Sequence, residues 1–380
     1  MSQSPCDSCQ NISFEQMVKS LSNTAKTGLR RFYPQTSNDL PYSTGLDSRG
    51  NWQLKGVSLR YAAISQIGIS QWLKYHPKDK TTLPILWPRI ADNHDKITHI
   101  GDFALALWAG VTSEADNCDI FARALSLGWQ AQADLCNAVE LAWIVQASVL
   151  ALLEHNDLKS CLEPLLREAK NRLVSLFRPQ HNLFQRHNRT GLKGVIGKRV
   201  ACFADQVYPI IALSTYGRCF DDKHSTELAA RAAEQICRLQ GHLGQWWWHY
   251  DTAEGRVCEE YPVFSVHQDA MAPMAIMAND RLTGLNHRRK IELGLRWSFG
   301  NNELNENLIL DDTGIIWRDI EKREPVKISR ILRGFLSVAG LQSLHRLAGK
   351  CFFGFRINRE CRPYHLGWIL YAWADYRSEA

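Results

Sequence analysis

Residues 138–177 have the sequence AVELAWIVQASVLALLEHNDLKSCLEPLLREAKNRLVSLF, and its two halves predict two kinds of helix. The first half, 138–153, is apolar almost all round, which is typical of a helix that is buried on every side. The second half keeps apolar residues only at a helical period, from Leu162 to Phe177, and Ser160 with Glu163 has the spacing of a capping box. The stretch therefore predicts an inner helix followed by an outer helix.

The same two kinds of helix alternate along the rest of the chain. Segments that are apolar almost all round lie at 57–73, 103–109, 203–213, 266–278 and 366–374, and another one-sided stripe covers 228–239. The sequence has no convincing strand alternation and no Asn-Gly hairpin signal, so we expect strand only in short loop hairpins. A two-layer bundle would not need so many buried helices. We therefore predict an all-α fold, an α/α toroid in which alternating inner and outer helices close a ring.

An internal repeat supports this ring. Asp205-Gln-Val-Tyr-Pro209 and Asp269-Ala-Met-Ala-Pro273 share the spacing DxxxP, 64 residues apart, and four apolar residues follow each copy. Because proline is tolerated in a first helical turn, each aspartate is expected at or just before the start of an inner helix. We expect residues 31–380 to form a single toroid domain, preceded by a segment, 1–30, that contains the first outer helix.

A second motif also indicates the toroid. Gln240-Gly-His-Leu-Gly244-Gln-Trp246 has the spacing QxxxGxW, and Gly50-Asn-Trp52 is a weaker, partial match to it. It resembles the QW signature of terpenoid cyclases and protein prenyltransferases. These families are α/α toroids in which Gln and Trp brace the end of an outer helix against the next loop. The DxDD acid motif of class II cyclases is missing, so terpene chemistry is the alternative rather than the main hypothesis.

Composition excludes several function classes. The 380 residues are 22% charged and 45% hydrophobic, which is typical of a folded protein. The net charge of +6 is spread along the chain, which mildly favours anionic ligands but does not indicate a nucleic-acid partner. The longest apolar run, 141–153, is shorter than the roughly 20 residues of a membrane span, and residues 1–10 lack the apolar core of a secretory signal. The 11 cysteines, an odd number, suit a reducing compartment, so we expect a cytoplasmic protein.

No metal or cofactor is predicted. Cys6 and Cys9 form a lone CxxC pair without a partner pair nearby, and dinucleotide, P-loop, nucleophile-elbow and HExxH motifs are absent. The charge-rich stretches 281–290 and 318–333 are expected to be solvated outer loops. The oligomeric state is left open by the sequence.

An aromatic loop is the first part of the candidate site. Residues 244–265 have the sequence GQWWWHYDTAEGRVCEEYPVFS and lead into His267, Gln268 and Asp269. Aromatic faces beside carboxylates suit a sugar ring, because its CH faces stack on Trp and its hydroxyls bind acidic groups. The alternative is a structural loop whose tryptophans fill gaps between hairpins. The substrate-binding residues expected from this region are Trp246, Trp247, Trp248, His249, Tyr250, Asp251 and Gln268.

Candidate acid/base residues lie where inner helices are expected to begin, because the loops there converge on one mouth of the ring. Asp205 and Asp269 form a candidate carboxylate pair, with His267 as a base or a donor to a uronate and Tyr261 as a proton donor. The alternative for each aspartate is a helix N-cap. A polar cluster also precedes the last buried helix, in which Arg362 suits a carboxylate or an interface. Further expected substrate-binding residues are Tyr208, Arg362, Tyr364 and His365.

Two short resemblances point to glycan chemistry. His99-Ile-Gly-Asp102-Phe103 resembles the His-Asp-x-Gly-Phe segment of unsaturated glucuronyl hydrolases, with the order of Asp and Gly shifted. Those enzymes are cytosolic α/α toroids, and the resemblance implies Asp102 as the catalytic acid and Glu140 as the second carboxylate. Residues 261–268, Tyr-Pro-Val-Phe-Ser-Val-His-Gln, resemble a Tyr/His-rich segment of glucuronyl C5-epimerases, which also contain an α/α barrel. Residues expected to add positive charge or hydroxyls to the same mouth are Lys55, Arg60 and Tyr61.

We therefore expect an enzyme that acts on an acidic, uronate-containing glycan by general acid/base chemistry, as a hydrolase, lyase or epimerase. Its acid/base pair would come from Asp102, Asp205, His267 and Asp269. One alternative is a terpene-cyclase-like enzyme in which the same aromatic residues shield a carbocation. The other is a toroid that only binds a glycan or a partner protein.

Overall fold

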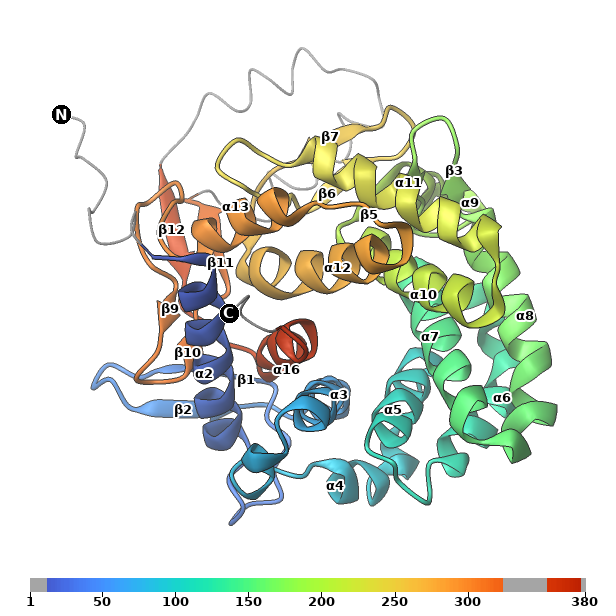
Figure 1. Cartoon of the computed structure of the whole chain (residues 1–380), viewed down its shortest axis with the longest axis horizontal. Helices are drawn as coiled ribbons and strands as arrows, with labels where there is room; N and C mark the ends of the chain where they lie inside the picture. Colours follow the sequence, from blue (N-terminus) through green and yellow to red (C-terminus); the bar gives the residue numbers. More distant parts are fainter. Residues whose placement is uncertain (1–11, 324–353, 377–380) are drawn as a thin grey trace.

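The computed structural model describes residues 12–323 and 354–376, and its helices form two concentric rings (Figure 1). Each inner helix packs against the next, and the last one packs against the first, so the inner ring is closed. The predicted α/α toroid is therefore confirmed. The inner helices are α3 (Leu59–Tyr75), α5 (Ile100–Thr112), α7 (Ala138–Glu154), α10 (Ala204–Phe220), α12 (Ala272–Thr283) and α16 (Pro363–Trp373).

Outer helices cover this ring from outside (Figure 1). All six segments that are apolar almost all round became inner helices, whereas both one-sided stripes became outer helices. The helix that precedes the ring, α2, packs against α16 and so joins the two ends of the described chain. The outer helices are α2 (Phe14–Phe32), the short α4 (Trp87–Ala91), α6 (Asp119–Gln132), α8 (Lys159–Ser175), α11 (Lys223–Leu239) and α13 (Arg288–Ser298).

The capping box predicted at the start of α8 is wrong. A 3₁₀ turn over Asn156–Leu158 continues directly into α8, so the helix begins at Lys159 with Leu158 at the N-cap position. Ser160 therefore lies inside the first turn, where its side chain makes no cap hydrogen bond.

The ring closes through backbone contact between α3 and α16. A Cβ atom added at Gly68 would lie 1.9 Å from the carbonyl oxygen of Gly367, and one added at Gly367 would lie 2.7 Å from the Cα of Ser65. Only glycine permits such an approach, because it has no side chain between the two backbones.

Every described strand lies in a connection that leads from an outer helix to the next inner helix. We call the end of the ring where the inner helices begin the N-terminal mouth, and the end where they stop the C-terminal mouth. The helix α9 (Gly191–Arg199) lies in one of these same connections. The antiparallel hairpins are β1 (Ser43–Leu46) with β2 (Trp52–Lys55), β3 (Phe177–Arg178) with β4 (Leu183–Phe184), and β9 (Ile309–Leu310) with β10 (Ile315–Ile316).

Two three-stranded sheets go beyond the predicted loop hairpins. Long connections must pair their backbone groups when they are buried, and here they do so with one another. The expectation that strand is confined to hairpins is therefore wrong for these sheets. They consist of β5 (Val200–Cys202), β6 (His249–Asp251) and β7 (Arg256–Glu259), and of β8 (Val263–Phe264), β11 (Asp319–Lys322) and β12 (Phe355–Asn358).

The charge-rich stretches are also more ordered than expected. β11 is the middle strand of its sheet and its first two residues are buried, so the prediction of a solvated loop is wrong for Asp319–Lys322. Residues 324–333 lie outside the described residues. The stretch 281–290 is helical at both ends, in α12 and α13. Within the described ranges, no helix combines the length and apolarity needed to cross a membrane.

Candidate functional site

The first turns of three neighbouring inner helices bring a cation and two carboxylates together at the N-terminal mouth. Arg60 is the second residue of α3, and Asp102 and Glu140 are the third residues of α5 and α7. Arg60 Nε donates a hydrogen bond of 2.5 Å to Asp102 Oδ1. His99, the N-cap residue of α5, places its Nε2 atom 3.3 Å from Glu140 Oε1. The predicted convergence of inner-helix starts is confirmed for these residues.

The guanidinium of Arg60 lies between a carboxylate and an aromatic face. Its central carbon is 5.5 Å from the ring centre of Trp143 on α7. Burial opposes its positive charge, but the hydrogen bond and charge of Asp102 outweigh burial and raise the pKa of Arg60. The side chains of Arg60 and Asp102 are 38% and 22% exposed, so a ligand at the mouth can reach this pair.

Glu140 also caps the N-terminus of its own helix. Its Oε2 atom accepts a hydrogen bond of 2.8 Å from the backbone N–H of Asn137, whose side chain accepts one from the Glu140 N–H. This capping box fixes the start of α7 and leaves Oε1 directed to His99.

Aromatic rings and a second arginine extend the site across α3 to α16. The ring of Tyr61 lies 5.0 Å from that of Tyr42 and 4.6 Å from that of Tyr364. Arg362, the N-cap residue of α16, donates a hydrogen bond of 2.9 Å to the Tyr61 hydroxyl and lies over the Tyr42 ring. Burial raises the pKa of Tyr61 and of Tyr364, which keeps both hydroxyls neutral. Tyr208 on α10 continues the aromatic lining, 5.3 Å from Trp143.

We call the following residues the mouth cluster: Arg60, Tyr61, Asp102, Glu140, Trp143, Tyr208, Arg362 and Tyr364. Sequence reasoning identified most of them, but it missed Trp143 because this residue lies in a helix that is apolar all round.

A buried carboxyl beside the mouth cluster was also missed. Asp319 is 1% exposed; its Oδ2 accepts a hydrogen bond of 3.1 Å from Asn358, and its Oδ1 has no partner. Arg318 Nε is 3.6 Å from Oδ2, beyond hydrogen-bond reach, while Arg318 Nη1 donates to Glu360 at 2.8 Å. Burial raises the pKa of Asp319 to about 7. A carboxyl that titrates near neutrality is a candidate for acid/base work, and no motif in the sequence marked it.

Asp205 and Asp269 are both buried, and the structure does not bring them together. Asp205 lies in the first turn of α10, where its Oδ2 accepts a hydrogen bond of 2.8 Å from the backbone N–H of Cys202. Asp269 Oδ1 is 2.7 Å from His365 Nε2, and its Oδ2 accepts a hydrogen bond of 3.2 Å from Ser298. Both oxygens of Asp269 are therefore engaged inside the protein.

The structural repeat has a different register from the DxxxP spacing. The amide of Gln206 binds both backbone groups of Phe184, and the amide of Gln268 binds both backbone groups of Trp246. These equivalent pairs lie 62 residues apart, not 64. A π-helical turn over His267–Met271 precedes α12, and the 62-residue and 64-residue spacings diverge at this turn. Asp205 and Asp269 consequently occupy different surroundings.

Most of the aromatic loop is packed into the protein. Trp246 and Tyr250 are fully buried, and Trp247 is nearly so, with its ring 6.0 Å from that of Tyr261. Trp248 is half-buried, and its ring stacks on His249 at 4.1 Å. Trp248 therefore offers more of its ring to a ligand than its two neighbours do.

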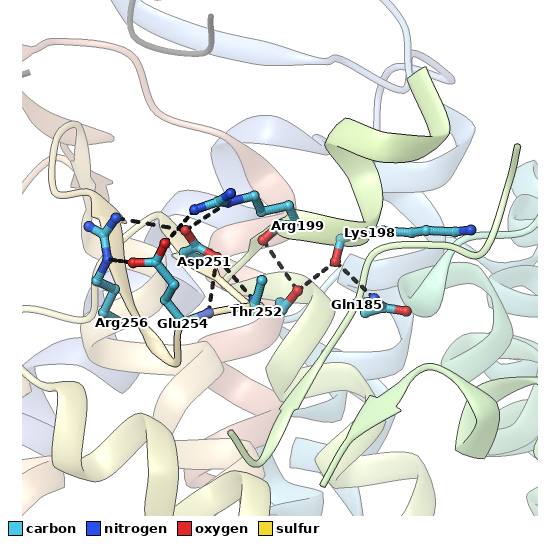
Figure 2. A network of polar contacts seen from close by, with 8 residues as sticks. Gln185, Lys198, Arg199, Asp251, Thr252, Glu254 and Arg256 are labelled. Atoms are coloured by element: carbon cyan, nitrogen blue, oxygen red, sulfur yellow. Dashed lines mark hydrogen bonds and ion pairs between the residues drawn. The ribbon is translucent and has the colours of Figure 1, made fainter. Parts of the chain in front are cut away.

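Asp251 fastens the turn between β6 and β7 (Figure 2). Its Oδ2 accepts a hydrogen bond of 3.0 Å from Arg199 Nε, and its Oδ1 accepts two backbone N–H groups of the turn that follows. Thr252 Oγ1 donates to the carbonyl oxygen of Lys198 at 2.6 Å, and Gln185 donates to the same oxygen at 2.9 Å. The network ties this turn to the junction of α9 and β5.

Tyr261 and His267 have well-defined local partners. The Tyr261 hydroxyl donates a hydrogen bond of 2.7 Å to Glu303, and burial beside this carboxylate raises the pKa of Tyr261. His267 packs against Phe203 and Phe264 with ring distances of 4.6 and 5.1 Å. Burial lowers the pKa of His267 to about 3, so the imidazole is neutral at neutral pH, and its Nδ1 atom has no hydrogen-bond partner.

The QW-like motif braces outer helices, as its resemblance implies. Gln240 follows the last residue of α11 and donates hydrogen bonds to the carbonyl oxygens of Gly244, at 3.0 Å, and Lys290, at 2.9 Å. Trp246 is buried close to Gly294 of α13. The motif therefore connects the end of α11 with α13.

The described part of the chain contains no group of three or more His, Cys, Asp or Glu side chains arranged to hold a metal ion. Cys6 and Cys9 lie outside the described residues. Activity without a metal therefore stays a prediction.

Solved structures with a similar fold include unsaturated glucuronyl hydrolases and a possible member of the GH105 family. The enzyme from Bacillus sp. GL1, described as responsible for glycosaminoglycan degradation, is 10% identical, with a TM-score of 0.57 over 95% of this chain and 96% of the other. An unsaturated glucuronyl hydrolase specific for heparin is 12% identical, with a TM-score of 0.57 over 94% and 96%. A possible member of the GH105 family from Salmonella enterica serovar Paratyphi A is 9% identical, with a TM-score of 0.56 over 99% and 96%.

The fold is that of the unsaturated glucuronyl hydrolases. No protein-family model matches the chain, and no curated protein matches it. The likeness covers nearly the whole length of the chain and of the solved structures.

Proposed function

We propose that the protein is a glycoside hydrolase that acts at the N-terminal mouth on a glycan with an acidic, uronate-type sugar. Asp102 is the general acid/base in this proposal. The observation that carries it is the pairing of Asp102 with Arg60 at the accessible starts of two adjacent inner helices. The shared fold supports the same reading, because the solved glycan-active enzymes have this ring.

Recognition of an acidic sugar is assigned to the arginines of the mouth. Arg60 and Arg362 each pair with a carboxylate of the protein, and a guanidinium binds carboxylates through two parallel hydrogen bonds. When a substrate carboxylate displaces Asp102 from Arg60, or Glu360 from Arg362, the arginine remains paired with a carboxylate. The half-buried rings of Tyr364 and Trp248 supply faces for the sugar's CH groups.

Asp102 and Glu140 supply the two carboxylates that glycoside hydrolysis needs, since both lie beside Arg60 on neighbouring first turns. The contacts of Asp205 and Asp269 support positioning roles, because one oxygen of Asp205 and both oxygens of Asp269 are engaged inside the protein. The lowered pKa of His267 likewise favours a neutral, structural imidazole. Tyr261, bound to Glu303, positions the loop behind Trp247.

The charged mouth disfavours the terpene-cyclase alternative. A carbocation needs a mostly apolar cavity, whereas this mouth holds the ion pairs of Arg60 with Asp102 and of Arg362 with Glu360. We also propose a cytoplasmic location without a nucleic-acid partner. The eight cysteines within the described ranges are all free, which supports a reducing compartment.

The test uses disaccharides that end in an unsaturated uronate, prepared with polysaccharide lyases from glycosaminoglycans. Hydrolysis releases the unsaturated uronate, whose ring then opens to a keto acid, so the conjugated double bond and its ultraviolet absorption are lost. Asp102→Asn should reduce turnover roughly 10²–10⁴-fold, the worth of a general acid/base, and leave the far-ultraviolet circular dichroism spectrum unchanged.

Asp119→Asn is the matched control, because Asp119 also lies in a first turn, that of α6, and forms an exposed ion pair with Arg123 across one helical turn. It should retain full activity. An Asp102→Asn variant with full turnover would remove Asp102 from the chemistry. A wild-type protein that binds these disaccharides without consuming them would leave only a glycan-binding toroid.

A further inference from the structure

The C-terminal mouth contains a cavity of about 680 Å³, at the opposite end of the ring from the mouth cluster. Its walls are the last turns of the six inner helices, from Tyr75 on α3 to Tyr371 on α16. This volume is within the range of small-molecule sites. The floor is buried, as Trp108 shows with 1% exposure, and the rim is open to solvent.

The floor carries an amide that the protein leaves unsatisfied. Gln146 lies on α7, lines the cavity and is 3% exposed, yet its Oε1 atom has no hydrogen-bond partner. Burial of a polar group without a partner costs free energy, so native proteins seldom contain one unless a ligand or water completes it. The amide therefore indicates a ligand group that donates a hydrogen bond at the bottom of the cavity.

The charges of the rim are balanced. Arg281 and Asp375 form an ion pair of 2.8 Å across the rim, so neither attracts a ligand of one sign. The inner helices also end here, and the partial negative charge of their carbonyl ends disfavours an anion. The charged lining residues, three of each sign, are Lys74, Arg218, Arg281, Glu114, Glu154 and Asp375.

Apolar surface lies among these polar groups. The ring of Tyr371 is half-buried above Trp108, with 5.6 Å between their centres, and Met274 and Met277 lie on the facing wall. A second hollow of about 410 Å³ adjoins the cavity, since Arg218 lines both. An elongated ligand can therefore continue from the cavity across the end of α10.

We propose that the C-terminal mouth binds a neutral oligosaccharide, with a sugar hydroxyl donating to Gln146. Hydroxyls both donate and accept hydrogen bonds, which suits a lining that mixes cations, carboxylates and an amide. The CH faces of the sugar rings suit the half-buried ring of Tyr371. The size of the cavity fits about two or three sugar units. This site is distinct from the proposed hydrolytic site in place and in the charge of its ligand.

The test measures binding of maltotriose, cellotriose and mannotriose to the full chain by isothermal titration calorimetry. At least one should bind with one site per chain. Gln146→Leu keeps the side chain's size but removes the amide, so the affinity should fall about tenfold or more, the worth of one hydrogen bond. Its melting temperature should stay level or rise, because no bond within the protein is lost.

Gln235→Leu is the matched control. Gln235 is 2% exposed, but its amide donates a hydrogen bond of 3.1 Å to the carbonyl oxygen of Gly255. This variant should melt at a lower temperature and bind the trisaccharide as the wild type does. Asp102→Asn should also bind it normally, which separates this site from the proposed hydrolysis.

Three results would overturn the inference. The first is that none of the three neutral trisaccharides binds at millimolar concentration. The second is that Gln146→Leu binds as tightly as the wild type. The third is a clear fall in melting temperature for Gln146→Leu, which would show that the amide has a structural partner.

Discussion

Replacing Asp319 with asparagine should change how the stability of the protein depends on pH. The wild-type carboxyl is buried beside Arg318, and one of its oxygens has no partner. In the variant, the amide oxygen still accepts the hydrogen bond from Asn358, but the side chain no longer ionises. The substitution therefore removes a titration while it keeps the size of the side chain.

The size of the effect follows from the pKa of Asp319, which burial raises from 3.8 to about 7. One pKa unit corresponds to about 1.4 kcal/mol, so ionising this carboxyl costs the folded protein up to about 4 kcal/mol. Between about pH 4 and pH 7, the folded chain holds a proton that the unfolded chain has lost. The free energy of unfolding contributed by Asp319 therefore falls as pH rises through this range.

Urea unfolding of the wild type and Asp319→Asn between pH 5 and pH 8.5 measures this contribution. The stability of the variant relative to the wild type should increase by about 2–4 kcal/mol across the range. His267 titrates in the opposite sense, because burial lowers its pKa to about 3 and its contribution is lost as pH falls below about 6.5. That contribution is common to both proteins and cancels in the difference.

Asp116→Asn, at an exposed position, should show no such trend. Parallel curves for the wild type and Asp319→Asn would refute the assignment of a raised pKa to Asp319.

Three further predictions test the core, the closure of the ring and the absence of a metal. Asp269→Asn replaces a charged acceptor of the His365 and Ser298 hydrogen bonds with a neutral one, so urea unfolding should show a loss of about 1–2 kcal/mol. Its turnover per folded molecule should be unchanged, and a hundredfold loss would instead place Asp269 in the chemistry. Gly68→Ala puts a methyl group against the Gly367 carbonyl and should cost about 2–3 kcal/mol in thermal melts; an unchanged melting temperature would contradict the backbone contact. Dialysis against a chelator should leave turnover intact, whereas loss of activity that zinc restores would reveal a metal site.

The sequence predicted the ring because inner helices of a toroid are covered on all sides. Their segments therefore lack a polar face, as 138–153 shows, and this pattern survives without any tertiary information. The start of α12 was less predictable, because the π-helical turn over His267–Met271 precedes the regular helix. The three-stranded sheets left no alternating pattern because their strands are only two to four residues long.

The site was predictable only where polar residues stand at helix starts. Asp102 and Arg362 interrupt apolar patterns, so they attract attention, whereas Trp143 is one apolar residue among many. Composition also does not distinguish an aromatic side chain that binds a sugar from one that fills the core. Trp246 and Trp248 are two residues apart in the same aromatic loop, but Trp246 is fully buried and Trp248 is half-buried. That difference depends on which segments pack over each ring.

The glycine contact between α3 and α16 also has a consequence for the order in which the ring is expected to form. Gly68 and Gly367 are 299 residues apart in the sequence, and contacts with such a large sequence separation are formed slowly. During synthesis, α3 leaves the ribosome long before α16 exists, so the flank that α16 will cover stays exposed to water. The earlier hairpins can stack on one another as an open crescent in this interval. The last helix then converts the crescent into a ring and covers its two exposed edges, on α3 and on α12.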